Sequence, residues 1–176
     1  VYKRQDFHSD PTHITGDPTV INALDLPADG ETVHGLTIKS YPVSESLTHD
    51  FGDRGPDDCA MYTFTLGGVT FLHIGDVGNP IEQDYLTDLS QRGIDVMFAL
   101  TGDHATLALD DLDDAIRAVK PKVVIPMHYY HERGRLQILP VSECTKRYPT
   151  EQVTYVGATD LTLTPETLPD AMHIYV

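Results

Sequence analysis

The stretch MYTFTLGGVTFLHIGDVG, residues 61–78, decides the fold class of this chain. Its two halves, 61–66 and 69–74, are strand-like, and the Gly67-Gly68 pair between them is a strong local signal for a hairpin turn. Gly75 and Asp76 follow the second half directly. Because glycine lets the chain turn sharply, the Asp76 carboxylate can project beyond the edge of the sheet. The stretch therefore predicts a hairpin that ends in an acidic side chain.

Downstream of this hairpin, helix-like and strand-like segments alternate. Asn79-Pro80 can cap and begin a helix, and Gly93 ends it. The apolar run 94–100 predicts a buried strand, 109–119 predicts a second helix that Pro121 stops, and 123–126 predicts a short central strand. The expected apolar helix faces are Ile81, Tyr85, Leu86 and Leu89 in the first helix, and Leu109, Leu112, Ala115, Ile116 and Val119 in the second. This alternation is typical of an α/β domain.

The flanking segments are less regular. Residues 36–41 alternate apolar and polar side chains, which favours a strand with one buried face, and 44–58 predicts a polar loop that contains glycines. In the first thirty residues we expect a loop that leads into a strand near 20–21. Late strands are expected at 153–156 and 161–163, on either side of Gly157.

The length and composition predict a single domain over residues 1–176. The 176 residues are 40% hydrophobic, enough for one core. No run of eighteen apolar residues occurs, and the first residues are polar, so we expect no membrane span or signal peptide and a soluble, cytoplasmic protein. The two cysteines do not form the dense pattern of a disulfide scaffold.

The formal net charge of −15 argues against nucleic acid as a partner, because such a field repels phosphate backbones. A solvated, acidic surface is the simplest interpretation of this charge. We therefore expect a small-molecule substrate. A homo-oligomer is compatible with the sequence.

Three side chains are expected at strand ends, where sites in layered α/β proteins gather. Asp76 follows the hairpin, His128 follows the strand that ends at Pro126, and His49 lies in the loop before the hairpin. Their nitrogen and oxygen donors suit zinc, manganese or iron. A single Gly-Asp or Met-His after a strand is more often a turn than a ligand. The order of all three along these elements is a much rarer coincidence, and we expect them to converge at one sheet edge.

From about residue 35 to 157 the sequence resembles the metallo-β-lactamase superfamily, in particular its lactonase-like branch, which includes proteins similar to ascorbate-6-phosphate lactonase. The segments that carry the resemblance are 48–50 (THD), 52–55 (GDRG), 72–78 (LHIGDVG), 94–96 (IDV) and 121–129 (PKVVIPMHY). The resemblance implies a four-layer αββα sandwich, incomplete at its N-terminus. It also implies that His49, Asp76 and His128 are metal ligands.

The family's earlier His-x-His-x-Asp-His motif, which supplies the remaining ligands, is not spelled in this sequence. Asp6, His8 and His13 lie where the segment just after that motif is expected. We therefore expect an N-terminally truncated domain, in which residues 1–5 are not native. Such a chain is expected to fold poorly, to bind metal weakly and to be close to inactive by itself.

In the intact protein the resemblance implies a metal-dependent hydrolase with two divalent transition-metal ions, zinc before manganese or iron. Asp76 would bridge the ions as a catalytic residue, and a metal-bound hydroxide would attack a small ester, lactone or phosphodiester. For substrate binding, His104 is balanced between a contact and a solvated loop position. Arg54 either holds an anionic substrate or, as we favour, pairs with Asp50 or Asp53.

Two other functions stay open. One is a non-catalytic binding module of the same fold, which the missing motif would permit. The other is a ribonuclease-like nuclease, which would be expected to carry a basic arm for RNA, and the sequence shows none. A serine-based hydrolase is disfavoured because no Gly-x-Ser-x-Gly motif occurs.

Overall fold

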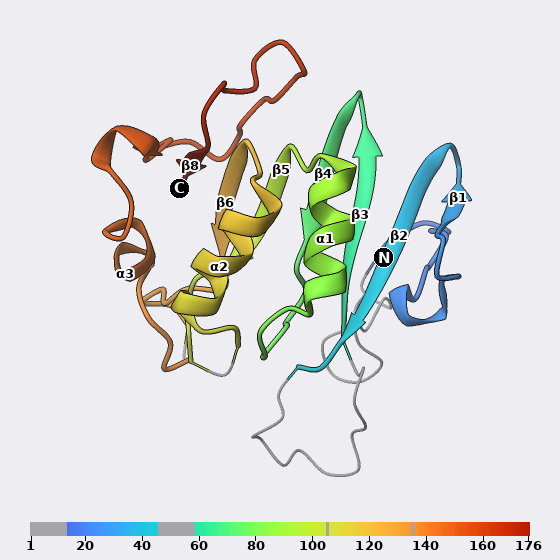
Figure 1. Ribbon diagram of the computed structural model, residues 1–176, viewed down its shortest axis with the longest axis horizontal. Helices are drawn as coiled ribbons and strands as arrows, with labels where there is room; N and C mark the ends of the chain where they lie inside the picture. Colours follow the sequence, from blue (N-terminus) through green and yellow to red (C-terminus); the bar gives the residue numbers. More distant parts are fainter. Residues whose placement is uncertain (1–13, 46–58, 105, 135) are drawn as a thin grey trace.

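The computed structural model describes residues 14–45, 59–104, 106–134 and 136–176. Eight strands form one sheet in the order β1-β2-β3-β4-β5-β6-β8-β7 (Figure 1). The strands are β1 Glu31–Val33, β2 Leu36–Val43, β3 Cys59–Leu66, β4 Val69–His73, β5 Val96–Leu100, β6 Val123–Met127, β7 Val153–Thr154 and β8 His173–Tyr175. The helices are α1 Gln83–Arg92, α2 Leu109–Val119 and α3 Val141–Thr145, with short 3-10 turns at Ala23–Asp25 and Thr150–Gln152.

The sheet is mixed. Strands β1 to β4 pair antiparallel, whereas β4, β5, β6, β8 and β7 pair parallel. The predicted hairpin is confirmed as β3 and β4, with Leu66 opposite Val69 across the Gly67-Gly68 turn. Helices α1 and α2 form the connections from β4 to β5 and from β5 to β6, and both lie on the same face of the sheet (Figure 1).

Both predicted long helices are present. α1 begins at Gln83, later than Asn79-Pro80 suggested, and Gly93 ends it in the left-handed conformation at φ 70°. α2 spans the predicted residues, and its five predicted face residues are all buried. It ends at Lys120, which is also left-handed, one residue before Pro121. None of the described helices has the length and apolarity that a membrane crossing requires.

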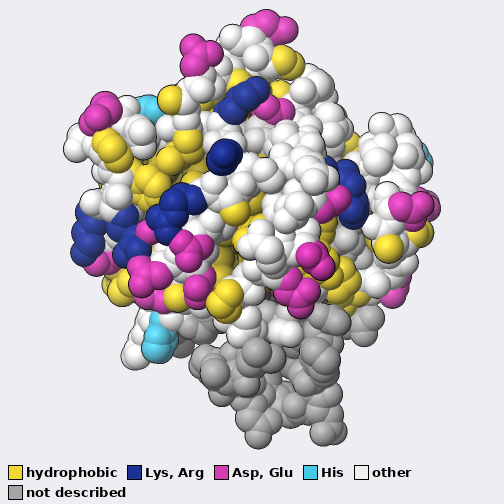
Figure 2. All heavy atoms as spheres, viewed as in Figure 1, with side chains coloured by type: hydrophobic (Ala, Val, Ile, Leu, Met, Phe, Trp, Pro, Cys, Tyr) yellow, Lys and Arg dark blue, Asp and Glu magenta, His cyan; other side chains and the backbone are white. Residues whose placement is uncertain are grey.

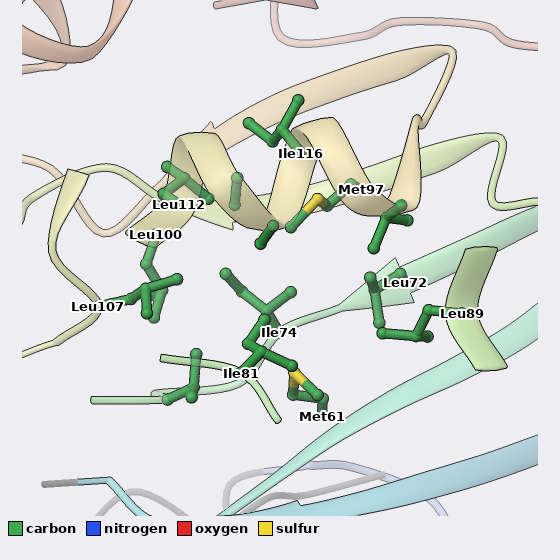
Figure 3. Packing of buried hydrophobic residues seen from close by; sticks show 14 of the residues in the cluster. Met61, Leu72, Ile74, Ile81, Leu89, Met97, Leu100, Leu107, Leu112 and Ile116 are labelled. Carbon is green, nitrogen blue, oxygen red and sulfur yellow. The ribbon is translucent and has the colours of Figure 1, made fainter. Parts of the chain in front are cut away.

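The main core lies between the sheet and these two helices. Leu72 of β4 and Met97 of β5 are fully buried, and they pack in one cluster with Leu89 of α1 and Leu112 of α2 (Figure 3). The two helices thus account for the buried apolar residues on one face of these strands.

The opposite face of the sheet has a different character. Val69, Val96 and Val123 are buried there beneath Leu163 and Leu168 of the C-terminal segment. On the same face, next to the three valines, five partly buried rings stack on one another. We call these rings the aromatic face: Tyr62, Phe64, Phe71, His73 and Phe98.

Several sequence-based expectations were wrong at the two ends. Residues 161–163 are not a strand, and the late strand at 153 covers only two residues because the chain then leaves the sheet. The sheet is completed instead by β8, a strand that the sequence pattern did not predict. No strand forms at 20–21, and the short elements β1 and α3 were not predicted. Of the expected four layers, the described residues form one sheet and one helical layer.

Candidate metal centre

The carboxyl ends of β4, β5 and β6 meet at one edge of the sheet, because the three strands are parallel neighbours. Asp76 follows β4, and His128 follows β6. Between them lies the end of β5, where Thr101 N donates to Met127 O at 3.0 Å. The predicted convergence of these two side chains on one sheet edge therefore agrees with the topology.

Asp76 is held in place by its close packing against the start of β3. Gly75 has φ 65°, and a Cβ at that position would lie 2.5 Å from Ala60 O, so only glycine fits. The Asp76 backbone N–H donates to Cys59 Sγ at 3.3 Å. The Asp76 residue is only 7% exposed. A carboxylate in such a position is costly to bury unless it has partners, and it is well suited to a cation.

His128 has an unusual backbone and an unsatisfied ring nitrogen. Its φ is 51°, a strained conformation that turns the chain out of β6. Its Nδ1 is buried and has no hydrogen-bond partner in the described part of the chain. A buried polar atom without a partner costs free energy, so its retention calls for an explanation such as a bound ion. The backbone beside it is tightly packed, since a Cβ on Gly102 would lie 2.3 Å from His128 O.

The residues present fit a metal ion in type and place. A carboxylate and an imidazole at one sheet edge are the donors that zinc takes. Strands two places apart lie about 10 Å apart, so Asp76 and His128 lie on either side of the end of β5. Within the described ranges, no group of three or more His, Cys, Asp or Glu could hold a metal ion. Asp76 and His128 therefore supply only part of a centre.

Of the other predicted site residues, only His104 lies in the described part of the chain. His49 and Arg54 lie outside the described residues, as do Asp6, His8 and His13. His104 is exposed in the loop that follows β5, next to Asp103, whose φ is 60°. It thus lies beyond the same sheet edge as Asp76 and His128.

His73 packs within the sheet, directly before the Gly75 turn. Its ring stacks on Tyr62 with centroids 5.1 Å apart, and its Nδ1 accepts a hydrogen bond from Gly75 N at 3.0 Å. Burial raises the pKa of Tyr62. The pair therefore supports the Gly75 turn that positions Asp76.

Cys59 has a structural role that the sequence did not reveal. It opens β3 and is fully buried, and its sulfur accepts the Asp76 backbone N–H. No motif marks it. The signal that could have found it is the hairpin register, which places the start of β3 beside the end of β4.

Comparisons with known proteins agree with this architecture. The family model described as a beta-lactamase superfamily domain matches residues 2–128. A UPF0173 metal-dependent hydrolase of Symbiobacterium thermophilum is 34% identical over 82 residues, which are 46% of this chain and 36% of that protein. A UPF0173 metal-dependent hydrolase of Desulforamulus reducens is 37% identical over 82 residues, 44% of this chain and 35% of that protein. The chain thus spans about a third of the length of these curated relatives.

Two solved structures share the fold. A candidate Zn-dependent hydrolase of the metallo-β-lactamase superfamily from Thermotoga maritima aligns with a TM-score of 0.62 at 22% identity, over 83% of this chain and 66% of its own. An isothiocyanate hydrolase from Delia radicum gut bacteria aligns with a TM-score of 0.53 at 16% identity, over 72% and 52%. With the eight-stranded mixed sheet and a family match over more than half its residues, the chain belongs to the beta-lactamase superfamily domain family.

Proposed function

We propose that this chain carries part of the metal centre of a hydrolase, with Asp76, His128 and His49 as ligands. The observation that carries the proposal is the placement of Asp76 and His128 at the carboxyl ends of β4 and β6, with the His128 Nδ1 buried and unpartnered in the described residues. The names of the curated relatives, all metal-dependent hydrolases, support it. His49 rests on the sequence resemblance alone.

Each residue has a physical task in this proposal. Asp76, fixed by the Gly75 turn and by Cys59, presents a carboxylate that can be shared by two cations. His128 contributes an imidazole nitrogen from a strained backbone position directly after β6. Two bound divalent ions, zinc or otherwise manganese or iron, would supply Lewis acidity and lower the pKa of water to about 7. The nearly complete burial of Asp76 limits competition from bulk water.

The substrate in this proposal is a small ester, lactone or phosphodiester, as in the lactonase-like branch of the superfamily. The chain's net charge of −15 disfavours a large polyanion such as RNA. We propose that His104, exposed beyond the same sheet edge, contacts such a substrate, while Arg54 either holds an anionic group or, as we favour, pairs with Asp50 or Asp53. The aromatic face is where the second sheet of a four-layer sandwich would pack.

Zinc affinity is the decisive measurement, because a chain with three proposed ligands is expected to hydrolyse substrates at close to the background rate. Zinc would be titrated against a chromophoric chelator for the native chain, Asp76→Ala and His128→Ala. We expect each substitution to weaken zinc binding by at least tenfold, since even neighbours of ligands contribute about that much.

His131→Ala is the matched control. His131 is exposed a few residues from His128, and its Nδ1 accepts from Arg133 N. This variant should bind zinc like the native chain. Equal affinities for all four proteins would contradict the proposed ligands. Hydrolysis of a lactone, an ester and bis-p-nitrophenyl phosphate would be followed in parallel, and efficient turnover by this chain would show that further ligands are present in it.

A further inference from the structure

A pocket lies at the amino end of β6, at the opposite end of this strand from the candidate metal centre. It has a volume of about 460 Å³, within the range of small-molecule sites. Its walls come from the last turns of α2, the link between α2 and β6, the residues after α3, and the segment before β8. It therefore joins four elements that are distant in the sequence.

This pocket is separate from the candidate metal centre. Lys122 lines the pocket just before β6 begins, whereas His128 follows the end of the same strand. Strand residues rise by about 3.3 Å each, so the length of β6 separates the two by roughly 17 to 20 Å. A ligand in the pocket would not touch a substrate at the metal edge.

The floor of the pocket is apolar. Ile116 is only 5% exposed, Pro121 is buried and Met172 is half-buried. Figure 2 shows hydrophobic surface over this part of the molecule with Lys and Arg side chains beside it. Such a floor can hold the hydrocarbon body of a ligand.

The rim is basic in a strongly acidic protein. Four of the chain's twelve Lys and Arg residues line the pocket, and two Asp residues accompany them: the six are Arg117, Lys120, Lys122, Arg147, Asp113 and Asp170. Cations at a helix C-terminus can simply offset the helix dipole, and Arg117 and Lys120 lie at that end of α2. That explanation does not extend to Lys122 and Arg147, which belong to other elements.

Ion pairs hold three of these cations in position. Arg147 Nε donates to Asp113 Oδ2 at 2.7 Å, and its guanidinium also pairs with Asp110. Lys122 Nζ lies 2.9 Å from Asp95 Oδ1, and Arg117 pairs with Asp114. The Asp113 carboxylate is further held by Tyr148 Oη, which donates to it at 2.6 Å. The hydrogen bonds to Asp113 and Asp110 raise the pKa of Arg147, so it stays charged.

Lys120 is different. It is exposed, it is fixed in the left-handed conformation by its N–H bond to Ile116 O, and no hydrogen bond or ion pair engages its ammonium group among the described residues. The Gln152 side chain, also on the wall, likewise has no hydrogen-bond partner there. The pocket thus combines an apolar floor with donors that the protein leaves available.

We propose that this pocket binds a small organic anion, with a carboxylate or phosphate head group at Lys120 and Gln152 and a short apolar body against Ile116 and Met172. The site is independent of the metal centre and does not rest on the proposed hydrolase activity.

Methyl NMR of the full chain tests this proposal, because methyl signals at native chemical shifts report the folded molecules specifically. The Ile116 and Met172 methyl signals would be followed during titration with hexyl phosphate, hexanoate, hexanol and inorganic phosphate. Hexyl phosphate and hexanoate should shift both signals saturably, with Kd on the order of 1 mM for ligands of this size. Hexanol should bind at least several-fold more weakly. Comparison of the two anions shows which head group is preferred.

Lys120→Gln should weaken hexyl phosphate binding about threefold, the effect of one solvent-exposed charge, and leave hexanol unchanged. Arg117→Gln removes another positive charge from the pocket rim and so tests independently whether this charge contributes to hexyl phosphate binding. Lys146→Gln is the matched control, because Lys146 is an exposed lysine beside Arg147 that does not line the pocket. The proposal is overturned if hexanol binds as tightly as the anions, if no methyl signal shifts, or if Lys120→Gln and Lys146→Gln behave alike.

Discussion

The two faces of the sheet in this molecule are covered very differently. On the helix face, Leu72, Met97 and Val124 are fully buried beneath α1 and α2. On the opposite face, neighbouring residues of the same strands, such as Phe71 and Phe98, remain half-exposed. The C-terminal segment covers only the valine row through Leu163 and Leu168.

The strand sequences are therefore more apolar than the coverage of the sheet by the described residues would require. Strands β4 to β6 are apolar on both sides, a pattern of sheets that are covered on both faces. The rings of the aromatic face stack on one another, with Phe64 and Phe71 centroids 4.9 Å apart, but stacking within one layer leaves their outer surfaces accessible.

The sharpest test compares two adjacent residues of β5 that point to opposite faces. Met97 is fully buried and Phe98 is half-buried. Met97→Ala should lower the free energy of unfolding by about 3 kcal/mol, as for a buried core methionine. Phe98→Ala should cost only about 1.5 kcal/mol, because part of its ring stays exposed and gains no burial. Chemical denaturation of the two variants measures both values. A cost for Phe98→Ala above that for Met97→Ala would show that the aromatic face is covered after all.

The aromatic face should also drive self-association. Replacing Phe64 and Phe71 together by Thr keeps residues that favour strands and removes exposed apolar area. We expect the concentration at which half of the chain associates to rise about tenfold, since less apolar surface is then removed from water on association. Sedimentation velocity measures this shift.

Leu66→Thr is the control for that experiment, because Leu66 is 63% exposed at the hairpin turn and is not part of the stacked ladder. If it reduces association as much as the double variant, exposed apolar area in general drives association, and the aromatic face has no special part in it.

The smallest effect is expected where α1 is tied to β2. Asp88 Oδ2 accepts hydrogen bonds from Tyr41 Oη at 2.5 Å, Arg92 Nε at 2.9 Å and Lys39 Nζ at 3.1 Å. Burial would raise the pKa of Asp88, but these bonds outweigh it and lower the pKa to about 2. The folded pKa lies below the unfolded value, so this stability is present above about pH 4 and is lost as pH falls towards 2.

In Asp88→Asn, the free energy of unfolding should therefore fall less steeply as the pH is lowered from 4 to 2. The effect should stay below about 1 kcal/mol, because the Asp88 side chain is 37% exposed and water screens its interactions. Denaturation at a series of pH values measures it. Asp114→Asn is the control, because the Asp114 side chain is 69% exposed, and it should leave the pH dependence of the unfolding free energy unchanged. The same pH dependence in both variants would contradict the role of Asp88.

The central part of the fold could be predicted from sequence because its signals are local. The Gly67-Gly68 turn, the apolar face of α2 and the left-handed stop at Gly93 each depend on a few neighbouring residues, and all are confirmed. The ends were predicted poorly for the opposite reason. β8 is only three residues long and becomes a strand by pairing with both β6 and β7, which is long-range information.

The same contrast between local and long-range information applies to the candidate site. Asp76 and His128 were found because each follows a strand with a clear pattern, and the structure puts both at one edge. The buried Nδ1 of His128 and the Cys59 contact could not be predicted, since they depend on how separate strands pack. The ligand role of each residue is still a proposal.

The separation of Asp76 and His128 along the chain has a consequence for how the protein folds. Between them lie α1, β5 and α2, and both parallel crossovers must close before the two side chains reach the same edge. Closing such long loops costs chain entropy before any contact compensates, so we expect these pairings to form late on the folding pathway. A cation that binds there cannot nucleate the structure. It would leave the rate of folding unchanged and slow the rate of unfolding, so that the holo form would be protected kinetically.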